Sequence, residues 1–288
     1  IDDMSSSTDP AAFAPEAITT VLCDLDGVVW LSRRPIPGSV EAVAALRASG
    51  RRVVFVTNNS ASTVGENVEA LERVGVHAAG DVFSSAQAGA HLVEAGERVL
   101  VVGGRGIHEA VRARGAVPVA ASETAEPSGF DALIVGLDRK FDYDRLAVAA
   151  SAVRAGARLI ATNSDATYPT PHGLLPGGGS IVAAVATASG VDPVVAGKPH
   201  PPMAELIVDE LASSDGSFDP GSALMVGDRP DTDGLFARAL GCAYALVRSG
   251  VTPPWARSPF AGFEAAPTVV ADDLAAVAAS LTDRRPPK

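Results

Sequence analysis

The chain has 288 residues, 47% of them hydrophobic and 20% charged, which suffices for one large or two medium domains with a sizeable core. Its formal net charge is -11 at pH 7, and no local basic patch offsets it, so we expect no nucleic-acid partner. No apolar run approaches the ~18–20 residues that cross a bilayer, so we expect no membrane partner and a cytoplasmic location.

Residues 1–17 are predicted to form a flexible N-terminal tail, because they are polar and lack the basic-then-apolar layout of a signal peptide. The first residue is not methionine, which suggests added residues or an incomplete start. Cys23 and Cys242 are the only cysteines, and both lie in apolar surroundings. We expect buried free thiols in a reducing compartment rather than a disulfide.

From residue 19 onward, short runs rich in β-branched residues alternate with alanine-rich segments of helical spacing. Most of the short runs are continuously apolar, as in parallel strands covered on both faces. The pattern predicts an α/β fold with a doubly wound parallel sheet, in which ligands bind beyond the carboxyl ends of the strands. The predicted strands are Thr19–Cys23, Val53–Thr57, Leu100–Val102, Ala132–Val135, Leu159–Ala161, Val194–Ala196, Ala223–Val226 and Tyr244–Val247; the predicted helices include Ser39–Ala48, Thr63–Val74, Tyr143–Ala155 and Ser180–Ala188.

The first predicted strand ends in two carboxylates, Asp24 and Asp26, followed by Gly27. Two acids crowded at a strand tip repel each other unless a cation or a shared proton relieves them. A magnesium site built around a carboxylate nucleophile requires this arrangement. An ordinary Asp-Gly turn at a strand end is the alternative, and the pair alone favours function only moderately.

The second predicted strand ends in Thr57, followed by Asn58, Asn59 and Ser60. A hydroxyl at a strand tip, with free amides entering a helix, makes a corner that binds anions. Helix capping by Asn or Ser is an equally good interpretation of this segment alone.

Two later strand ends carry charged side chains. Lys198 follows the run Val194–Ala196 and can reach a central anion, with Pro199 beginning the next helix. Asp228 follows another strand and can complete a magnesium shell of oxygen ligands, while Asp233 can brace the lysine or a metal-bound water. Several aspartates on one loop are costly without a cation, so this segment is the stronger signal.

Together these segments resemble the haloacid dehalogenase superfamily. Within it they are similar to the phosphatase branch that includes the 4-nitrophenylphosphatases, the phosphoglycolate and pyridoxal-phosphate phosphatases and the NagD-like enzymes. The resemblance runs in order from about Val21 to Leu281, with no departure at the catalytic positions. Its strings are Asp24-Leu25-Asp26-Gly27-Val28-Val29-Trp30, Thr57-Asn58-Asn59-Ser60, Val101-Val102-Gly103-Gly104, Val135-Gly136-Leu137-Asp138, Gly197-Lys198-Pro199 and Gly227-Asp228-Arg229 with Thr232-Asp233.

The resemblance implies a magnesium-dependent phosphomonoester phosphatase that works through an aspartyl-phosphate. Asp24 would be the nucleophile, and Asp26 would protonate the leaving alcohol and then deprotonate the attacking water. Mg²⁺ would be held by the Asp24 carboxylate, the Asp26 main-chain carbonyl and Asp228. The remaining implied roles are phosphate binding by Thr57 and the amides of Asn58 and Asn59, charge neutralisation by Lys198, and bracing by Asp233.

The resemblance also implies a Rossmann-like core, at 18–96 and 193–283, with an inserted smaller α/β cap at 97–192. Within the cap, Gly103–Gly106 looks like a dinucleotide-binding fingerprint, but Glu109 occupies the third glycine position, which favours a simple turn. We expect the cap to supply substrate contacts and to exclude water. We also expect two copies to pair, as a homodimer, through the cap.

By resemblance, the specificity loop would run from Thr162 to His172. Asn163 and Asp165 are candidates either to hydrogen-bond hydroxyls of the substrate or to brace this loop, with equal weight. Tyr168 and His172 are candidates for substrate contact or for packing. Tyr168 stands nearest to the position where the pyridoxal-phosphate phosphatase carries a histidine, which argues against that substrate.

A polar cap loop favours a small polyol phosphate, with glycerol 3-phosphate the best guess. 2-Phosphoglycolate, a sugar phosphate and a nucleotide are the open alternatives. Asp26 argues against a dehalogenase, which needs no acid at that position. Lys140, the only lysine of the cap, follows a strand-end loop and argues against a Schiff-base phosphonatase. A phosphomutase and a non-catalytic sensor of a phosphorylated metabolite are less favoured.

Overall fold

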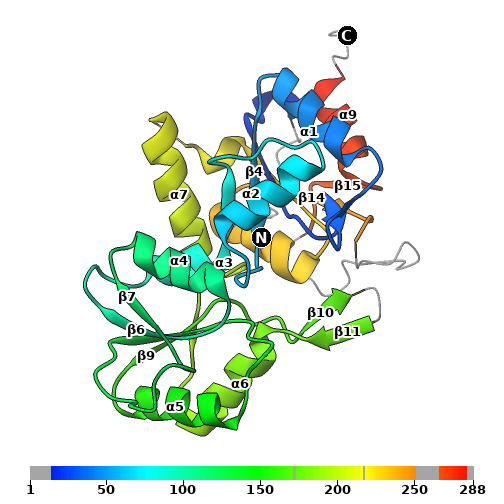
Figure 1. Cartoon of the computed structure of the whole chain (residues 1–288). Helices are drawn as coiled ribbons and strands as arrows, with labels where there is room; N and C mark the ends of the chain where they lie inside the picture. The colour runs from blue at the N-terminus through cyan, green and yellow to red at the C-terminus, as the bar shows by residue number, and fades with distance from the viewer. Residues whose placement is uncertain (1–13, 171–172, 217, 251–265, 284–288) are drawn as a thin grey trace, which may run out of the picture.

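The computed structural model describes residues 14–170, 173–216, 218–250 and 266–283. It confirms the predicted α/β fold. Two parallel sheets carry helices on both faces (Figure 1). The larger sheet and its helices form the core in the upper part of the view, and the smaller sheet belongs to the cap below it.

The core sheet has six strands in the order β15-β14-β13-β1-β4-β5, and neighbouring strands are parallel throughout. The chain extends the sheet from β1 to one side first, and later returns to build the other side. The order therefore reverses between β1 and β13, which is where open α/β sheets bind ligands. The strands are β1 (Thr20–Cys23), β4 (Arg52–Thr57), β5 (Val82–Ser84), β13 (Ala223–Gly227), β14 (Ala243–Val247) and β15 (Val269–Ala271).

Side chains of the core strands alternate between two apolar layers. Val21 and Cys23 pack with the helices of one face, and Leu22 packs with those of the other. This two-sided burial explains why the strand sequences are continuously apolar. One layer uses α1 (Ser39–Ala48), α2 (Val64–Arg73) and α9 (Leu274–Thr282), and the other uses α3 (Ser85–His91), α7 (Pro201–Asp215) and α8 (Leu235–Leu240).

The cap sheet has five parallel strands in the order β12-β9-β8-β6-β7. Helices α5 and α6 cover one face, and α4 and α3 cover the other. A separate hairpin of β10 and β11 projects from the cap at the right of Figure 1. The cap elements are β6 (Arg98–Val102), α4 (Arg105–Ala113), β7 (Val117–Ala120), β8 (Ala132–Val135), α5 (Tyr143–Arg154), β9 (Arg158–Ala161), β10 (Thr167–Thr170), β11 (Gly173–Pro176), α6 (Gly178–Ser189) and β12 (Val194–Val195).

Helix α3 packs against both sheets. Gly89 faces the cap, where an added Cβ would lie 3.6 Å from Ile134 and 3.8 Å from Ile160. The small side chains of α3 allow the two sheets to approach it closely. Core and cap therefore share one continuous buried cluster, whose members include Val54, Val56, Ala86, Ala88, Ala90, Val99 and Ile134.

The start of α7 and the strand before it differ from the prediction. Val194–Val195 pair with β9 at the edge of the cap sheet, although the predicted core resumes at residue 193. Val194 is 55% exposed, so Lys198 does not follow a buried strand. Helix α7 begins at Pro201 rather than at Pro199. A two-residue edge strand has a neighbour on one side only, which its apolar sequence does not reveal. The domain limits at 96/97 and 192/193 themselves stay a prediction.

The predicted N-terminal tail lies largely outside the described residues. Within it, Pro15–Ala17 form a short 3-10 helix, so the tail prediction does not hold there. Both cysteines are free; Cys23 is buried and Cys242 is half-buried. In the described part of the chain, no helix combines the length and the apolar character that crossing a bilayer requires.

Candidate active site

The site lies where the core sheet reverses its order. Asp24 follows β1 and Asp228 follows β13, and these two strands are parallel neighbours. The Asp24 N–H continues the ladder by donating to the Val226 carbonyl at 2.9 Å. The carboxyl ends of adjacent strands thus bring together two acids that are 204 positions apart in sequence, the difference between their residue numbers.

Glycines allow the backbone to pass close to these acids. Gly27 has a φ of 96°, and a Cβ there would lie 2.6 Å from the carboxyl carbon of Asp228. At Gly227 and Gly250 a Cβ would overlap Asp233 and Asp228, respectively. Gly27 therefore serves both the turn after β1 and the close packing of the acid from the neighbouring strand.

Lys198 connects two of the acids. Its Nζ donates to Asp24 Oδ1 at 2.8 Å and to Asp233 Oδ1 at 2.7 Å, and its side chain is only 2% exposed. Burial alone would lower the pKa of Lys198, but the carboxylates of Asp233 and Asp24 raise it above its ordinary value. The ammonium is therefore charged at every physiological pH and points at Asp24.

The acidic cluster fits a divalent cation. Asp24, Asp228 and Asp233 each place a carboxylate oxygen within 4.8 Å of the others. Against the single ammonium of Lys198, three carboxylates leave an excess of two negative charges. Asp233 already accepts from Lys198 with one oxygen and from the Arg229 N–H, at 3.1 Å, with the other. Asp24 and Asp228 are thus the carboxylates best placed to hold Mg²⁺, which prefers oxygen ligands.

The ionisation of Asp24 depends on its burial and on the charges around it. Burial raises the pKa of the Asp24 carboxyl well above its usual range, and Asp233 and Asp228 raise it further, while Lys198 lowers it in part. A bound divalent cation would favour the ionised carboxylate, the form that can attack.

Asp26 lies at the solvent side of the site. Asp26 is exposed, although neighbouring protein atoms partly desolvate its carboxyl. Partial desolvation raises the pKa of Asp26, and the Trp30 side chain with the charges of Arg33 and Lys198 lowers it in part. Because its pKa is raised, the Asp26 carboxyl keeps its proton to a higher pH than an ordinary aspartate does.

The residues predicted to bind phosphate lie at the end of β4 and just beyond it. Thr57 is buried, and its Oγ1 accepts from the Asn59 N–H at 3.1 Å. The Asn58 carbonyl accepts from Ser85 Oγ at 2.7 Å and from Asn163 Nδ2 at 2.8 Å. The Asn58 amide group donates to the Lys198 carbonyl at 3.0 Å. Asn58 therefore ties the corner to the lysine loop and to the cap.

The two cap candidates contact the core directly. Asn163 is buried, and besides donating to Asn58 it accepts from the Asp165 N–H at 3.2 Å. Asp165 accepts from Asn58 Nδ2 and from Arg229 Nη1, each at 3.2 Å. These contacts favour the bracing role. Tyr168 lies on β10, away from these bonds, and His172 lies outside the described residues.

The glycine-rich segment after β6 is a packing device. A Cβ at Gly104 would overlap the Ala61 backbone, and one at Gly106 would overlap the Ser62 backbone. The Gly106 N–H donates to the Ala61 carbonyl at 3.3 Å. A loop of the core therefore packs against the start of α4, where a dinucleotide phosphate would otherwise bind. This packing agrees with the turn that the sequence favours over a dinucleotide site.

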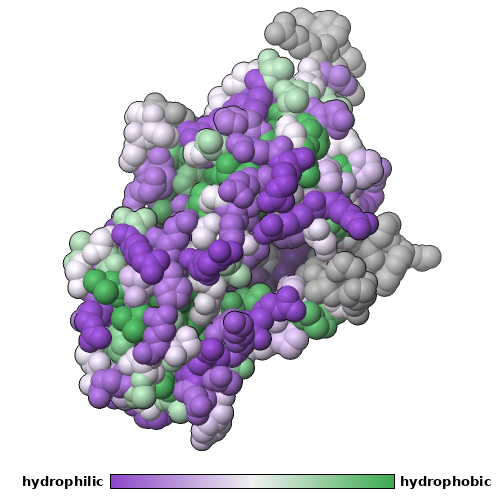
Figure 2. All heavy atoms as spheres, viewed as in Figure 1, coloured by the Kyte–Doolittle hydropathy of each residue, from purple (hydrophilic) through white to green (hydrophobic). Residues whose placement is uncertain are grey.

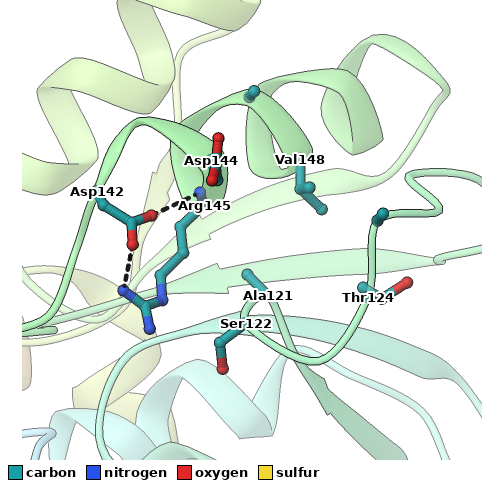
Figure 3. Close-up of a pocket in the computed structure, with 9 residues that line it drawn as sticks. Ala121, Ser122, Thr124, Asp142, Asp144, Arg145 and Val148 are labelled. Carbon is teal, nitrogen blue, oxygen red and sulfur yellow. Dashed lines mark hydrogen bonds and ion pairs between the residues drawn. The ribbon is translucent and has the colours of Figure 1, made fainter.

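A pocket of about 410 Å³ lies in the cap, beside the start of α5 (Figure 3). Arg145 points at Asp142 there and donates to it at 2.9 Å, and Asp138 lies 3.6 Å from the same guanidinium. Two carboxylates neutralise the only cation of the pocket lining, so the pocket is unsuited to phosphate. The hollow between core and cap, with a mostly hydrophilic rim, is visible in Figure 2.

Three residues of the site make contacts that the sequence does not reveal. Ser85 holds Asn58, Arg229 holds Asp165, and Ser249 Oγ donates to the Gly27 carbonyl at 2.7 Å. Each of them contacts a residue that is distant in sequence, so only the fold reveals its partner. Arg229 belongs to a segment, Gly227-Asp228-Arg229, that resembles the family, but the family pattern does not predict its contact with the cap.

A carboxylate beside a buried lysine, with an acidic cluster that fits a divalent cation beyond the ends of parallel strands, is suited to phosphoryl transfer. The chain belongs to the haloacid dehalogenase-like hydrolases. The family model of that description matches residues 21–117, and a second model, described as HAD-hydrolase-like, matches residues 195–277. The predicted family is thereby confirmed, and the protein is a phosphatase of this type.

Two similar proteins and one solved structure illustrate the relationship. D-glycerol 3-phosphate phosphatase of Mycobacterium tuberculosis is 41% identical over 259 residues, covering 88% of this chain and 69% of that protein. Chronophin of Mus musculus is 37% identical over 81% of both chains. The crystal structure of the M. tuberculosis glycerol phosphate phosphatase with magnesium has a TM-score of 0.77 and 38% identity, covering 90% of this chain and 77% of that one. With the donor set described above, it supports the predicted Mg²⁺ cofactor.

Proposed function

We propose that the protein hydrolyses a small phosphate monoester through a phosphoryl group carried on Asp24. The observation that carries this proposal is the buried Lys198, which donates to Asp24 at 2.8 Å beside Asp228. Phosphoryl transfer depends mainly on placing positive charge around the phosphate oxygens and on aligning the nucleophile.

In the first step, an Asp24 oxygen attacks phosphorus while the bond from phosphorus to the ester oxygen breaks. Asp26 gives its proton to the departing oxygen, so the alcohol leaves neutral. The raised pKa of Asp26 suits this task, because the carboxyl keeps a proton to give. The products of the step are the alcohol and an aspartyl-phosphate at Asp24.

In the second step, water attacks phosphorus and the bond from phosphorus to the Asp24 oxygen breaks. Asp26, now ionised, removes a proton from that water. Inorganic phosphate leaves, and both aspartates return to their starting states.

The charge of the transferred phosphoryl group is shared among several groups. Thr57 and the amides of Asn58 and Asn59 would bind its oxygens, and Lys198 would neutralise part of its charge. Asp24, the Asp26 main-chain carbonyl and Asp228 would hold Mg²⁺. When bound, this ion supplies further positive charge to the phosphate and orients it for attack. Asp233 keeps the lysine in place.

Reduction with borohydride tests the covalent step, since it converts an acyl phosphate at Asp24 into homoserine. The expected result is homoserine at position 24 after quenching during turnover, found by peptide mass spectrometry. Absence of the product in protein that is quenched while turning over would reject the covalent mechanism.

We propose glycerol 3-phosphate as the preferred substrate and the cap as the part of the chain that selects it. The name of the M. tuberculosis relative supports this choice, as does the polar cap loop. 2-Phosphoglycolate, sugar phosphates and nucleotides are the alternatives, and a mutase or a sensor would release no phosphate from any of them. Phosphate release from a panel of these esters, with both glycerol 3-phosphate enantiomers, tests the choice.

Pairing of two copies through the cap stays a prediction, as does the cytoplasmic location. The outer edge of the cap sheet at β7 supports pairing, because Val117 is 51% exposed there and, among the described strands, β7 has a neighbour on one side only. Light scattering on the purified protein tests it, with a monomeric mass as the contrary result.

A further inference from the structure

Asp165 belongs to the cap and contacts two loops of the core. One carboxylate oxygen accepts from Asn58 Nδ2, in the phosphate corner, at 3.2 Å. The other accepts from Arg229 Nη1, next to the metal-binding Asp228, also at 3.2 Å. The side chains of Asp165 and Arg229 are 21% and 35% exposed, so the pair is partly shielded from solvent. Both oxygens of Asp165 thus have protein partners.

The backbone around Asp165 is fixed from the cap side. The Gly179 N–H donates to the Asp165 carbonyl at 2.9 Å. A Cβ at Gly177 would overlap the Asp165 carbonyl, and one at Gly179 would overlap the Ser164 carbonyl. The glycines at the start of α6 therefore let the helix press against this loop. A loop held this closely presents the Asp165 carboxylate to the core in one position.

The cap as a whole rests on the core through helix α3, whose alanines join the buried cluster that both sheets share. Apolar packing of this kind is non-directional, so it sets the distance between two bodies better than their lateral position. Directional contacts are needed to align the cap with the reacting groups. Asp165 supplies two of them, at the edge of the site.

We propose that Asp165 is a positioning residue that aligns the cap with the phosphate corner through Asn58 and with the metal loop through Arg229. The proposal rests on the phosphatase function but not on the identity of the substrate. Because Asp165 acts through these two partners, it serves every substrate alike. A shift of about 1 Å in a positioned group can cost roughly 10²-fold in rate.

The test compares variants on two substrates of different shape, 4-nitrophenyl phosphate and glycerol 3-phosphate. Asp165→Ala removes both bonds. Asp165→Asn keeps an oxygen for the Asn58 amide but loses the charge that faces Arg229. Asp231→Asn is the matched control, because Asp231 also lies beside Arg229, at 3.5 Å, yet belongs to the core and is 58% exposed. Arg229→Gln alone and the double variant Asp165→Ala with Arg229→Gln complete a double-mutant cycle.

We expect Asp165→Ala to lower kcat/KM by about 10-fold or more on both substrates, with the loss mainly in kcat, since an interaction needed only in the transition state is affected. Asp165→Asn should recover part of the loss. Asp231→Asn should stay within about 2-fold of wild type, because Asp231 is exposed and its contact with Arg229 does not join the cap to the core. The activity of the double variant should lie within about 2-fold of that of the less active single variant, because both changes remove the same contact between Asp165 and Arg229. Thermal unfolding of each variant separates these effects from loss of the fold.

A loss confined to glycerol 3-phosphate would overturn the proposal, since it would make Asp165 a contact for the leaving group. Fully additive losses in the double variant, or wild-type activity of Asp165→Ala, would also overturn it. If wild-type protein hydrolyses the aryl ester but not glycerol 3-phosphate, the proposed substrate fails. The comparison then continues with the aryl ester and the best ester of the panel.

Discussion

Lys198 Nζ lies 2.7 Å from Asp233 Oδ1, and both side chains are almost completely buried, with exposed fractions of 2% and 1%. The second oxygen of Asp233 accepts from the Arg229 N–H, at the start of the short π-helix Pro230–Gly234. Asp233 is thereby fixed to the loop that follows β13. The lysine that it holds is aimed at Asp24 on the neighbouring strand.

Removing one partner of this buried pair should destabilise the fold. Asp233→Asn leaves Lys198 with Asp24 as its one remaining carboxylate partner in the described site, and we expect the free energy of unfolding to fall by about 3 kcal/mol, the lower end of the range for broken buried pairs. Urea denaturation monitored by circular dichroism measures the change. Asp231→Asn, an exposed change two positions away, should stay within about 0.5 kcal/mol. Equal effects of the two changes would contradict a special role for Asp233.

Asp24→Asn removes the attacking charge and keeps the size of the side chain. We expect kcat to fall by at least ~10³, the scale that follows removal of a nucleophile. The fold should survive, because burial opposes the charge of Asp24 and Lys198 keeps Asp233 as a partner. Steady-state phosphate release measures the loss, and circular dichroism serves as the control. A variant with more than a tenth of the wild-type rate would exclude Asp24 as the nucleophile.

Asp26→Asn should separate substrates by their leaving groups. An alkyl ester such as glycerol 3-phosphate needs a proton on the departing oxygen, so its kcat should fall by about 10²–10⁴, the usual contribution of general acid catalysis. A nitrophenolate leaves without a proton, so formation of the aspartyl-phosphate from 4-nitrophenyl phosphate should fall much less. The initial burst of nitrophenol reports that step directly. If the burst slows as much as alkyl ester turnover does, the acid role of Asp26 is wrong.

Asp228→Ala should weaken Mg²⁺ binding by roughly 10- to 100-fold or more, because even the loss of an outer contact to a metal ligand costs that much. Titration of activity with Mg²⁺ measures the shift. Calcium should inhibit, since its coordination number of 6–8 lets Asp24 bind through both oxygens and blocks attack.

Thermal unfolding gives a readout of the metal that does not depend on activity. Mg²⁺ should raise the Tm of the wild-type protein by mass action and should leave the Tm of Asp228→Ala almost unchanged at the same concentration. Full activity of the wild-type protein in excess chelator would contradict the metal role altogether.

The sequence by itself determined the strand ends that carry chemistry. Asp24, Thr57 and Asp228 each follow a continuously apolar run, and two-sided burial of a parallel strand is the physical reason that such runs stand out. The order of these segments also determined the family. Strands β5, β7 and β15 are among those that escaped prediction. β5 and β15 have only three residues, and β7 contains Pro118 and has no buried residue, so none of them shows the longer apolar run that marks a buried strand.

The contacts between residues that are far apart in sequence depend on the tertiary structure. Val194–Val195 have the composition of a core strand, yet they pair with the cap, because strand pairing is decided by long-range register. Asn163 and Asp165 are equally suited, as isolated polar residues, to a substrate or to a protein partner. Their bonds to Asn58 and Arg229 depend on where the shared apolar cluster and helix α3 bring the cap, and that packing is a property of the whole folded chain.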